Sequence, residues 1–147
     1  MPVLYKIKFI FRLIWIFCLL FLAPPTVANN AQFVAKDHIV IDLRSGVEWL
    51  RCSVGQRWNG IECVGDIVKL NQEMSMQAIN IANEQLGGNW RLPTREELEN
   101  IVCHKCNRPK IDSSIFPNTP AEPFWTGEQN KYSPRHVWSV NFFTGHT

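Results

Sequence analysis

The chain has 147 residues, of which 46% are hydrophobic, with a formal net charge of +2, so it suits one domain of ordinary size. Residues 1–28 contain three of the 15 basic side chains and none of the 13 acidic ones, which leaves a net charge of −1 on the rest. That balance, without any Lys/Arg run, excludes the basic surface of a nucleic-acid-binding protein, and we expect no nucleic-acid partner.

The first 28 residues have the pattern of a secretory signal peptide. A basic segment precedes the apolar run 13–23, and Thr26 and Ala28 stand at the −3 and −1 positions of a cleavage site. The apolar run is shorter than the about 20 residues of a membrane span, although an uncleaved anchor is the alternative. We therefore expect a secreted or periplasmic protein, with a linker at 29–37 and a domain at 38–147.

Four cysteines follow the signal segment, namely Cys52, Cys63, Cys103 and Cys106. An even number of cysteines in an exported chain predicts disulfides, and four cysteines allow three pairings. Sequence proximity favours Cys52–Cys63 and Cys103–Cys106, but spacing alone does not fix the pairing.

The first predicted element is a β-hairpin that starts at Ile39. A turn at 42–46 contains Asp42 and Gly46, and period-two alternation places Val47 and Trp49 on one face of the second strand. Asp42 is expected in the turn and in solvent. Residues 53–66, with three glycines, are predicted to form a loop that the first disulfide closes.

A first helix is predicted from an N-cap at Ser75 to the Gly87–Gly88 pair that ends it. Its apolar residues fall on one face, so we expect this helix to pack in the core through Ala78, Ile79, Ala82 and Leu86.

A second helix is predicted to begin at Thr94. Thr94 and Glu97 have the spacing of a capping box, and Pro93 fixes the direction of the chain before them. Arg91 lies between Trp90 and Leu92, so we expect it to be buried or half-buried and paired with a carboxylate or loop carbonyls. The buried face is expected to consist of Leu98, Ile101 and Val102.

The C-terminal third is predicted to be an ordered loop followed by one strand. Residues 111–125 contain three prolines and are read as loop. In 136–143, Trp138, Val140 and Phe142 alternate with polar residues, which predicts a half-buried strand. Such a strand needs a partner, and we identify none in the sequence.

The motif Cys103-His104-Lys105-Cys106 admits three interpretations: a structural disulfide, a redox pair or part of a metal site. A reactive thiolate is favoured at a helix N-terminus, whereas these cysteines follow the predicted second helix. A metal site would need a further ligand at a suitable spacing. The structural disulfide is the favoured interpretation, and we expect no metal, cofactor or catalytic residue.

Taken in order, several motifs resemble those of the Lcl C-terminal domain family, named for the last domain of a Legionella collagen-like adhesin. The motifs are DLRSGVEW at 42–49, GGNWRLPTREELENIV at 87–102, IDSSIFPNTPAEPFWTG at 111–127 and VWSVNFFTGHT at 137–147. The resemblance covers 39–147. We expect structural roles for Asp42, Gly46, Trp49, Trp90, Arg91, Pro93, Thr94, Glu97, Trp125 and Trp138.

The resemblance implies an α+β, C-type-lectin-like fold with two helices, a small twisted antiparallel sheet and long ordered loops. It also implies a further strand after residue 147, so we expect a chain that is truncated relative to the family. No catalytic activity is known for the family, and the named adhesin's domain is associated with sulfated glycans and with trimers. The residues that bind a sugar do not carry over to this sequence.

The sequence therefore predicts an exported, non-enzymatic binding or adhesion domain whose ligand class is a glycan or another cell-surface molecule, with the oligomeric state open. Two alternatives remain: a thiol redox or oxidase-like enzyme that uses Cys103 and Cys106, and a nonfunctional fragment.

Overall fold

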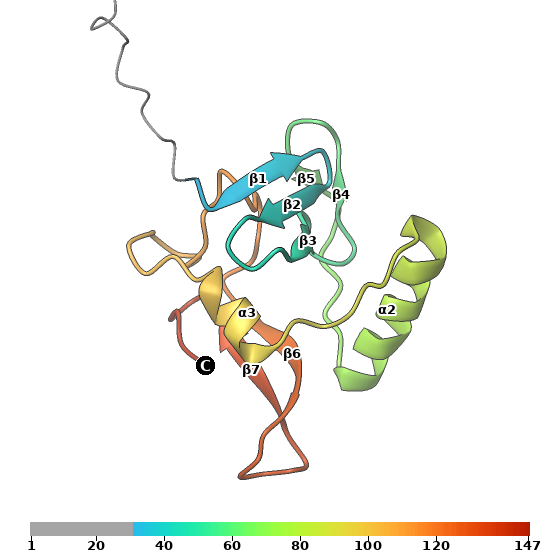
Figure 1. The fold of residues 1–147 in the computed structure, drawn as a ribbon, viewed down its shortest axis with the longest axis vertical. Helices are drawn as coiled ribbons and strands as arrows, with labels where there is room; N and C mark the ends of the chain where they lie inside the picture. The colour runs from blue at the N-terminus through green and yellow to red at the C-terminus, as the bar shows by residue number, and fades with distance from the viewer. Residues whose placement is uncertain (1–30) are drawn as a thin grey trace, which may run out of the picture. The chain divides into compact units, whose positions relative to one another are not determined.

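The computed structural model describes residues 31–147, which form an α+β unit (Figure 1). Helices α2 and α3 accompany seven short strands in three antiparallel sheets. The signal-peptide prediction for residues 1–28 lies outside the described part. Within 31–147, no helix is both long and apolar enough to cross a membrane.

The first sheet has the order β1-β2-β3, with β1 at Phe33–Lys36, β2 at Ile39–Asp42 and β3 at Glu48–Leu50. The predicted hairpin is thus confirmed as β2 and β3. Strand β1, however, lies inside the segment 29–37 that we expected to be a linker. It is held by antiparallel pairing with β2 and by an edge-on contact of the Phe33 ring with Phe116, 5.7 Å between centroids. Because Phe33 is its only half-buried residue, β1 has no apolar alternation that the sequence could reveal.

Asp42 was expected in solvent, and this expectation is wrong, because its side chain is only 1% exposed. Its carboxylate accepts hydrogen bonds from the backbone N–H of Arg44, the hydroxyl of Ser45 and the side-chain amide of Gln32. Burial by itself would raise the pKa of Asp42, but these hydrogen bonds together lower it below its ordinary value. Asp42 therefore closes the turn that Gly46, at φ +71°, completes.

The predicted loop at 53–66 contains a second hairpin, formed by β4 at Arg57–Trp58 and β5 at Cys63–Val64. The side chain of Asn59 accepts hydrogen bonds from the N–H groups of Ile61 and Glu62 and so forms its turn. Cys63 is bonded to Cys52, with Cα atoms 5.5 Å apart, which is the pairing that sequence proximity favours.

Helix α2 runs from Gln72 to Leu86 and begins one turn earlier than predicted. Its N-cap is Asn71, whose side chain accepts the N–H of Met74, whereas Ser75 lies inside the helix and is buried. The Ser75 hydroxyl donates to the carbonyl of Asn71 at 2.8 Å, a bond that a cap-forming serine would not make.

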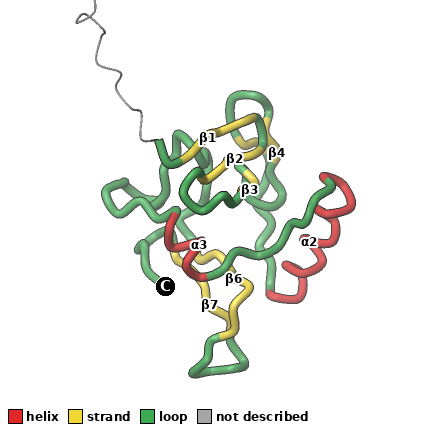
Figure 2. Tube along the Cα trace, viewed as in Figure 1, coloured by secondary structure: helices red, strands yellow, loops and turns green. Residues whose placement is uncertain are grey.

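The expectation that this helix packs in the core is also wrong. Only Ser75 of α2 is buried, Leu86 is 50% exposed, and α2 contributes nothing to the main apolar cluster. The helix lies at one side of the unit (Figure 2) and is held there by the Asn83 side chain, which bonds both the N–H and the carbonyl of Trp90. Helical periodicity shows which side of a helix is apolar but not how deeply that side is buried.

Helix α3, at Arg95–Asn100, supplies the helical part of the core, as predicted. Leu98 and Ile101 are 4% and 6% exposed, and Val102 packs against the same cluster. The cluster is completed from the sheets and the long loop by Val40, Ile111, Phe116, Val140 and Phe142.

The third sheet pairs β6, at Pro123–Gln129, with β7, at Val137–Asn141. The predicted loop at 111–125 therefore ends earlier than expected, because residues 123–125 belong to β6. The expectation that the sequence contains no partner for the last strand is also wrong, because β6 is that partner. The sequence of β6 does not have a recognisable strand pattern, because the strand starts with a proline, contains Gly127 and has an irregular register between Trp125 and Gln129.

Candidate functional site

The start of α3 is organised by the motif that runs from Trp90 to Glu97. The capping box is present: the Thr94 hydroxyl accepts the N–H of Glu97, and the Glu97 carboxylate accepts the N–H of Thr94 at 2.8 Å. The carbonyl of Pro93 accepts the N–H of Gly127 at 2.8 Å, which ties this start to β6. The motif therefore fixes α3 beside the β6–β7 hairpin.

Arg91 is paired as predicted but is not buried, because its side chain is 57% exposed. Two of its nitrogen atoms donate to the two carboxylate oxygens of Glu97, at 2.8 and 2.7 Å, and one also bonds the carbonyl of Leu92. Arg91 thus holds the capping carboxylate from the solvent side, so its charge is not removed from water.

The Arg91–Glu97 pair predicts a pH-dependent loss of stability. The hydrogen bonds from Arg91 are the main cause that lowers the pKa of Glu97 from 4.5 to about 2, against the opposing effect of burial. Because the folded state binds the proton less tightly, this stabilisation is present above pH 5 and is lost as the pH falls from about 5 to 2. We expect Glu97→Gln to lower the free energy of unfolding by about 1–2 kcal/mol at pH 7, since water screens the exposed Arg91.

Urea unfolding of the native protein and Glu97→Gln at pH 7 and at pH 3 measures this effect. Glu96→Gln is the matched control, because Glu96 is exposed in the same helical turn and belongs to none of the ion pairs of the described part. A difference between native and Glu97→Gln that stays constant with pH would contradict the assignment.

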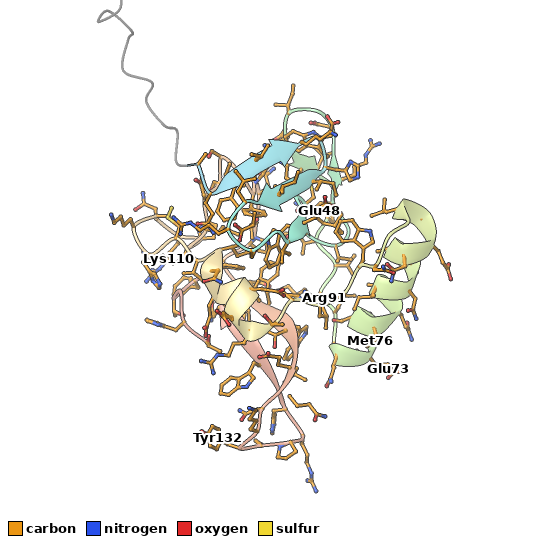
Figure 3. All side chains as sticks on the ribbon, viewed as in Figure 1. Glu48, Glu73, Met76, Arg91, Lys110 and Tyr132 are labelled. Carbon is orange, nitrogen blue, oxygen red and sulfur yellow. A yellow bond between two sulfur atoms is a disulfide. The ribbon has the colours of Figure 1, made fainter. Side chains whose placement is uncertain are left out.

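A cleft of about 720 Å³ lies between the start of α3 and the distal half of the β6–β7 hairpin. Two aromatic side chains line it, Trp138 from β7 and Tyr132 from the hairpin loop. Tyr132 is 92% exposed and stands at the far end of the hairpin (Figure 3). Trp138 is half-buried, and the guanidinium of Arg95 lies 4.8 Å from its ring centroid. The cleft thus offers the exposed ring of Tyr132, whereas Arg95 covers one face of the Trp138 ring.

The charged side chains of the cleft are predominantly acidic. Glu96, Glu99 and Glu128 line it together with Arg95 and Lys131. Arg95 is already paired with Glu99 at 3.0 Å, and its backbone N–H donates to Glu128. Lys131 therefore remains as the only cation of the lining that forms no ion pair within the described residues.

Of the residues singled out in the sequence, only Trp138 lines this cleft. Trp49 packs against the core, and the indole N–H of Trp125 donates to the carbonyl of Leu70 at 2.8 Å. Asp42 and Gly46 form the β2–β3 turn and do not line the cleft. Tyr132 carries no local signal in the sequence. Lys131 and Glu128 are visible there only as surface charges, because the strand β6 that places them beside Tyr132 has no strand pattern.

The Cys103–Cys106 motif lies just after α3 and contains a disulfide, with Cα atoms 5.3 Å apart. The Lys110 ammonium group donates hydrogen bonds to the backbone carbonyls of His104 and Cys106, at 3.2 and 2.7 Å. These bonds hold the loop between the two cysteines in place. Residues 31–147 contain no group of three His, Cys, Asp or Glu side chains placed to hold a metal ion. The arrangement favours a structural link.

Thiol titration separates a structural disulfide from a redox pair. We expect the folded protein to show no reactive thiol before or after mild reductant, because Lys110 ties the loop between the two cysteines. Reduction of Cys103–Cys106 at a glutathione-like potential, with Cys52–Cys63 intact, would instead support the redox interpretation.

Comparison with known protein families identifies a family for most of the chain. The model of the Lcl C-terminal domain family matches residues 38–147. No curated protein and no solved structure matches the chain.

Proposed function

Because the chain belongs to the Lcl C-terminal domain family over residues 38–147, an adhesin-associated family, we propose that it is an exported, non-enzymatic domain that binds a cell-surface ligand. The signal-peptide pattern of residues 1–28 and the two disulfides support export. We further propose that the α+β unit is a variant of the C-type-lectin-like fold, which the two helices, short antiparallel sheets and long loops support.

The proposed ligand is a glycan that binds in the cleft between α3 and the β6–β7 hairpin. The observation that carries this proposal is the exposed ring of Tyr132 beside the half-buried Trp138 and three carboxylates in one open cleft. Aromatic rings with a polar handle can stack on the apolar face of a sugar, and carboxylates can accept hydrogen bonds from its hydroxyls. The excess of carboxylates over cations favours a neutral or amino-bearing sugar over a sulfated one.

A glycan array, with a heparin column beside it at low salt, tests this proposal on the exported protein. We expect retention on neutral or amino-bearing glycans and a loss of at least about tenfold in affinity for Tyr132→Ala, because stacking surface is removed. Ile61→Ala is the matched control: Ile61 is 85% exposed on the β4–β5 hairpin and should leave binding unchanged. No retention on any glycan at low salt, or equal retention of Tyr132→Ala, would contradict the proposal.

A further inference from the structure

The tip of the β4–β5 hairpin contains the dipeptide Asn59-Gly60, whose two amide groups are placed to react with each other. The Oδ1 atom of Asn59 accepts the backbone N–H groups of Ile61 and Glu62, both at 2.8 Å. Among residues 31–147, neither the Nδ2 group of Asn59 nor the backbone N–H of Gly60 has a hydrogen-bond partner. The side-chain carbonyl is thus held by donors, while its amino group and the next backbone nitrogen are free.

We propose that Asn59 is a site of self-catalysed covalent modification, in which its carboxamide becomes a carboxylate. The backbone nitrogen of Gly60 bonds to Cγ of Asn59, its proton passes to the Nδ2 group, and that group leaves as ammonia. Water then opens the resulting five-membered imide at either of its two carbonyl carbons. Opening at the side-chain carbonyl gives aspartate at position 59, and opening at the main-chain carbonyl gives isoaspartate.

The hydrogen bonds of the turn favour the first of these steps. Attack on Cγ moves negative charge onto Oδ1, which already accepts the N–H groups of Ile61 and Glu62. Donors that are in place before the charge develops stabilise a transition state of this kind, as an oxyanion hole does. The same two bonds draw electron density away from Cγ, so they also make this carbon a better electrophile.

The hairpin tip leaves room for the rotation that brings the two groups together. Gly60 has a φ of +102°, and a Cβ atom placed on it would meet no heavy atom within 4 Å. Strands β4 and β5 pair through only two residues each, so local opening of the tip breaks few hydrogen bonds. Both Asn59 and Gly60 are exposed, so water reaches the imide.

The modification changes the hairpin tip and leaves the rest of the unit in place. Isoaspartate adds one carbon to the main chain and so disturbs the bond from the N–H of Asn59 to the carbonyl of Glu62. Strand β5 is held independently by the Cys52–Cys63 disulfide and by Asn118, whose side-chain amide donates to the carbonyl of Cys63 at 2.8 Å. No residue of the tip lines the cleft beside α3, so the inference does not rest on the glycan proposal.

Peptide mapping of the folded protein, incubated at mildly alkaline pH, tests the inference. The tryptic fragment 58–69 should gain the mass that replacement of NH2 by OH requires, and it should become a substrate of isoaspartate methyltransferase. Asn107 is the matched control within the same chain, because it is exposed but is followed by Arg108. We expect Asn59 to convert at least about tenfold faster than Asn107, since glycine has no side chain to obstruct the attack.

Two further comparisons separate the turn from the dipeptide. Asn59→Gln keeps a carboxamide but needs a six-membered ring, and it should convert at least about tenfold more slowly. The reduced chain in guanidinium chloride has the dipeptide without the turn, and we expect the folded protein to convert at least as fast. The inference is overturned if the folded protein converts more slowly than the unfolded chain, or if Asn107 or Asn59→Gln converts as fast as Asn59.

Discussion

Phe142→Ala is expected to lower the free energy of unfolding by about 3–5 kcal/mol, the range for removal of a buried aromatic ring. The Phe142 side chain is 1% exposed, and its ring packs edge-on against Phe124 with centroids 5.2 Å apart. The ring thus lies where β6 and β7 meet the core. Chemical denaturation followed by tryptophan fluorescence measures the effect.

The neighbouring residue supplies the control for this prediction. Phe143 is 44% exposed and only covers the guanidinium of Arg108, at 3.9 Å from the ring centroid. Phe143→Ala should therefore lower the free energy of unfolding by less than about 1 kcal/mol. Equal effects of the two substitutions would contradict the burial of Phe142 in the core and the exposure of Phe143.

Removal of the Cys52–Cys63 disulfide, as Cys52→Ala with Cys63→Ala, is expected to lower the free energy of unfolding by about 3 kcal/mol. The bond joins residues 11 apart in the sequence and so restricts the unfolded chain. It also fixes the β4–β5 hairpin, which pairs through only two residues on each strand.

The second disulfide is the matched comparison, because Cys103 and Cys106 are only 3 apart in the sequence. Loop-closure entropy then predicts a smaller loss, of about 1.5–2 kcal/mol, for Cys103→Ala with Cys106→Ala. The two double variants are compared by urea unfolding under non-reducing conditions. A larger loss for the shorter loop would show that the contacts of the Cys103–Cys106 loop, not chain entropy, dominate its contribution.

The sequence predicts those parts of the fold that local patterns determine. The Thr94–Glu97 capping box and the β2–β3 hairpin depend on residues a few positions apart, and both are present. The sequence predicts that Arg91 pairs with a carboxylate or with loop carbonyls, and it pairs with Glu97. The exposure of Arg91 depends on which distant segments cover it, and the neighbouring residues in the sequence do not determine that.

The remaining elements depend on contacts between distant segments. Strand β1 is defined by its pairing with β2 and by Phe116, far along the chain, and β6 is defined by its pairing with β7 in spite of Pro123 and Gly127. Helix α2 was predicted correctly as a helix, but its position outside the core results from α3 and the sheets filling that core. The candidate cleft joins α3 to the β6–β7 hairpin, so it could not be predicted before β6 was known.

Binding of a surface glycan in the cleft between α3 and the β6–β7 hairpin, as proposed above, can be mapped residue by residue. We would titrate isotope-labelled protein with the glycan that the array retains best and map the amide chemical shifts. We expect the shift changes to concentrate at Lys131, Tyr132, Trp138 and the first turn of α3. Changes confined to α2 or to the Cys103–Cys106 loop, with the cleft amides unmoved, would contradict it.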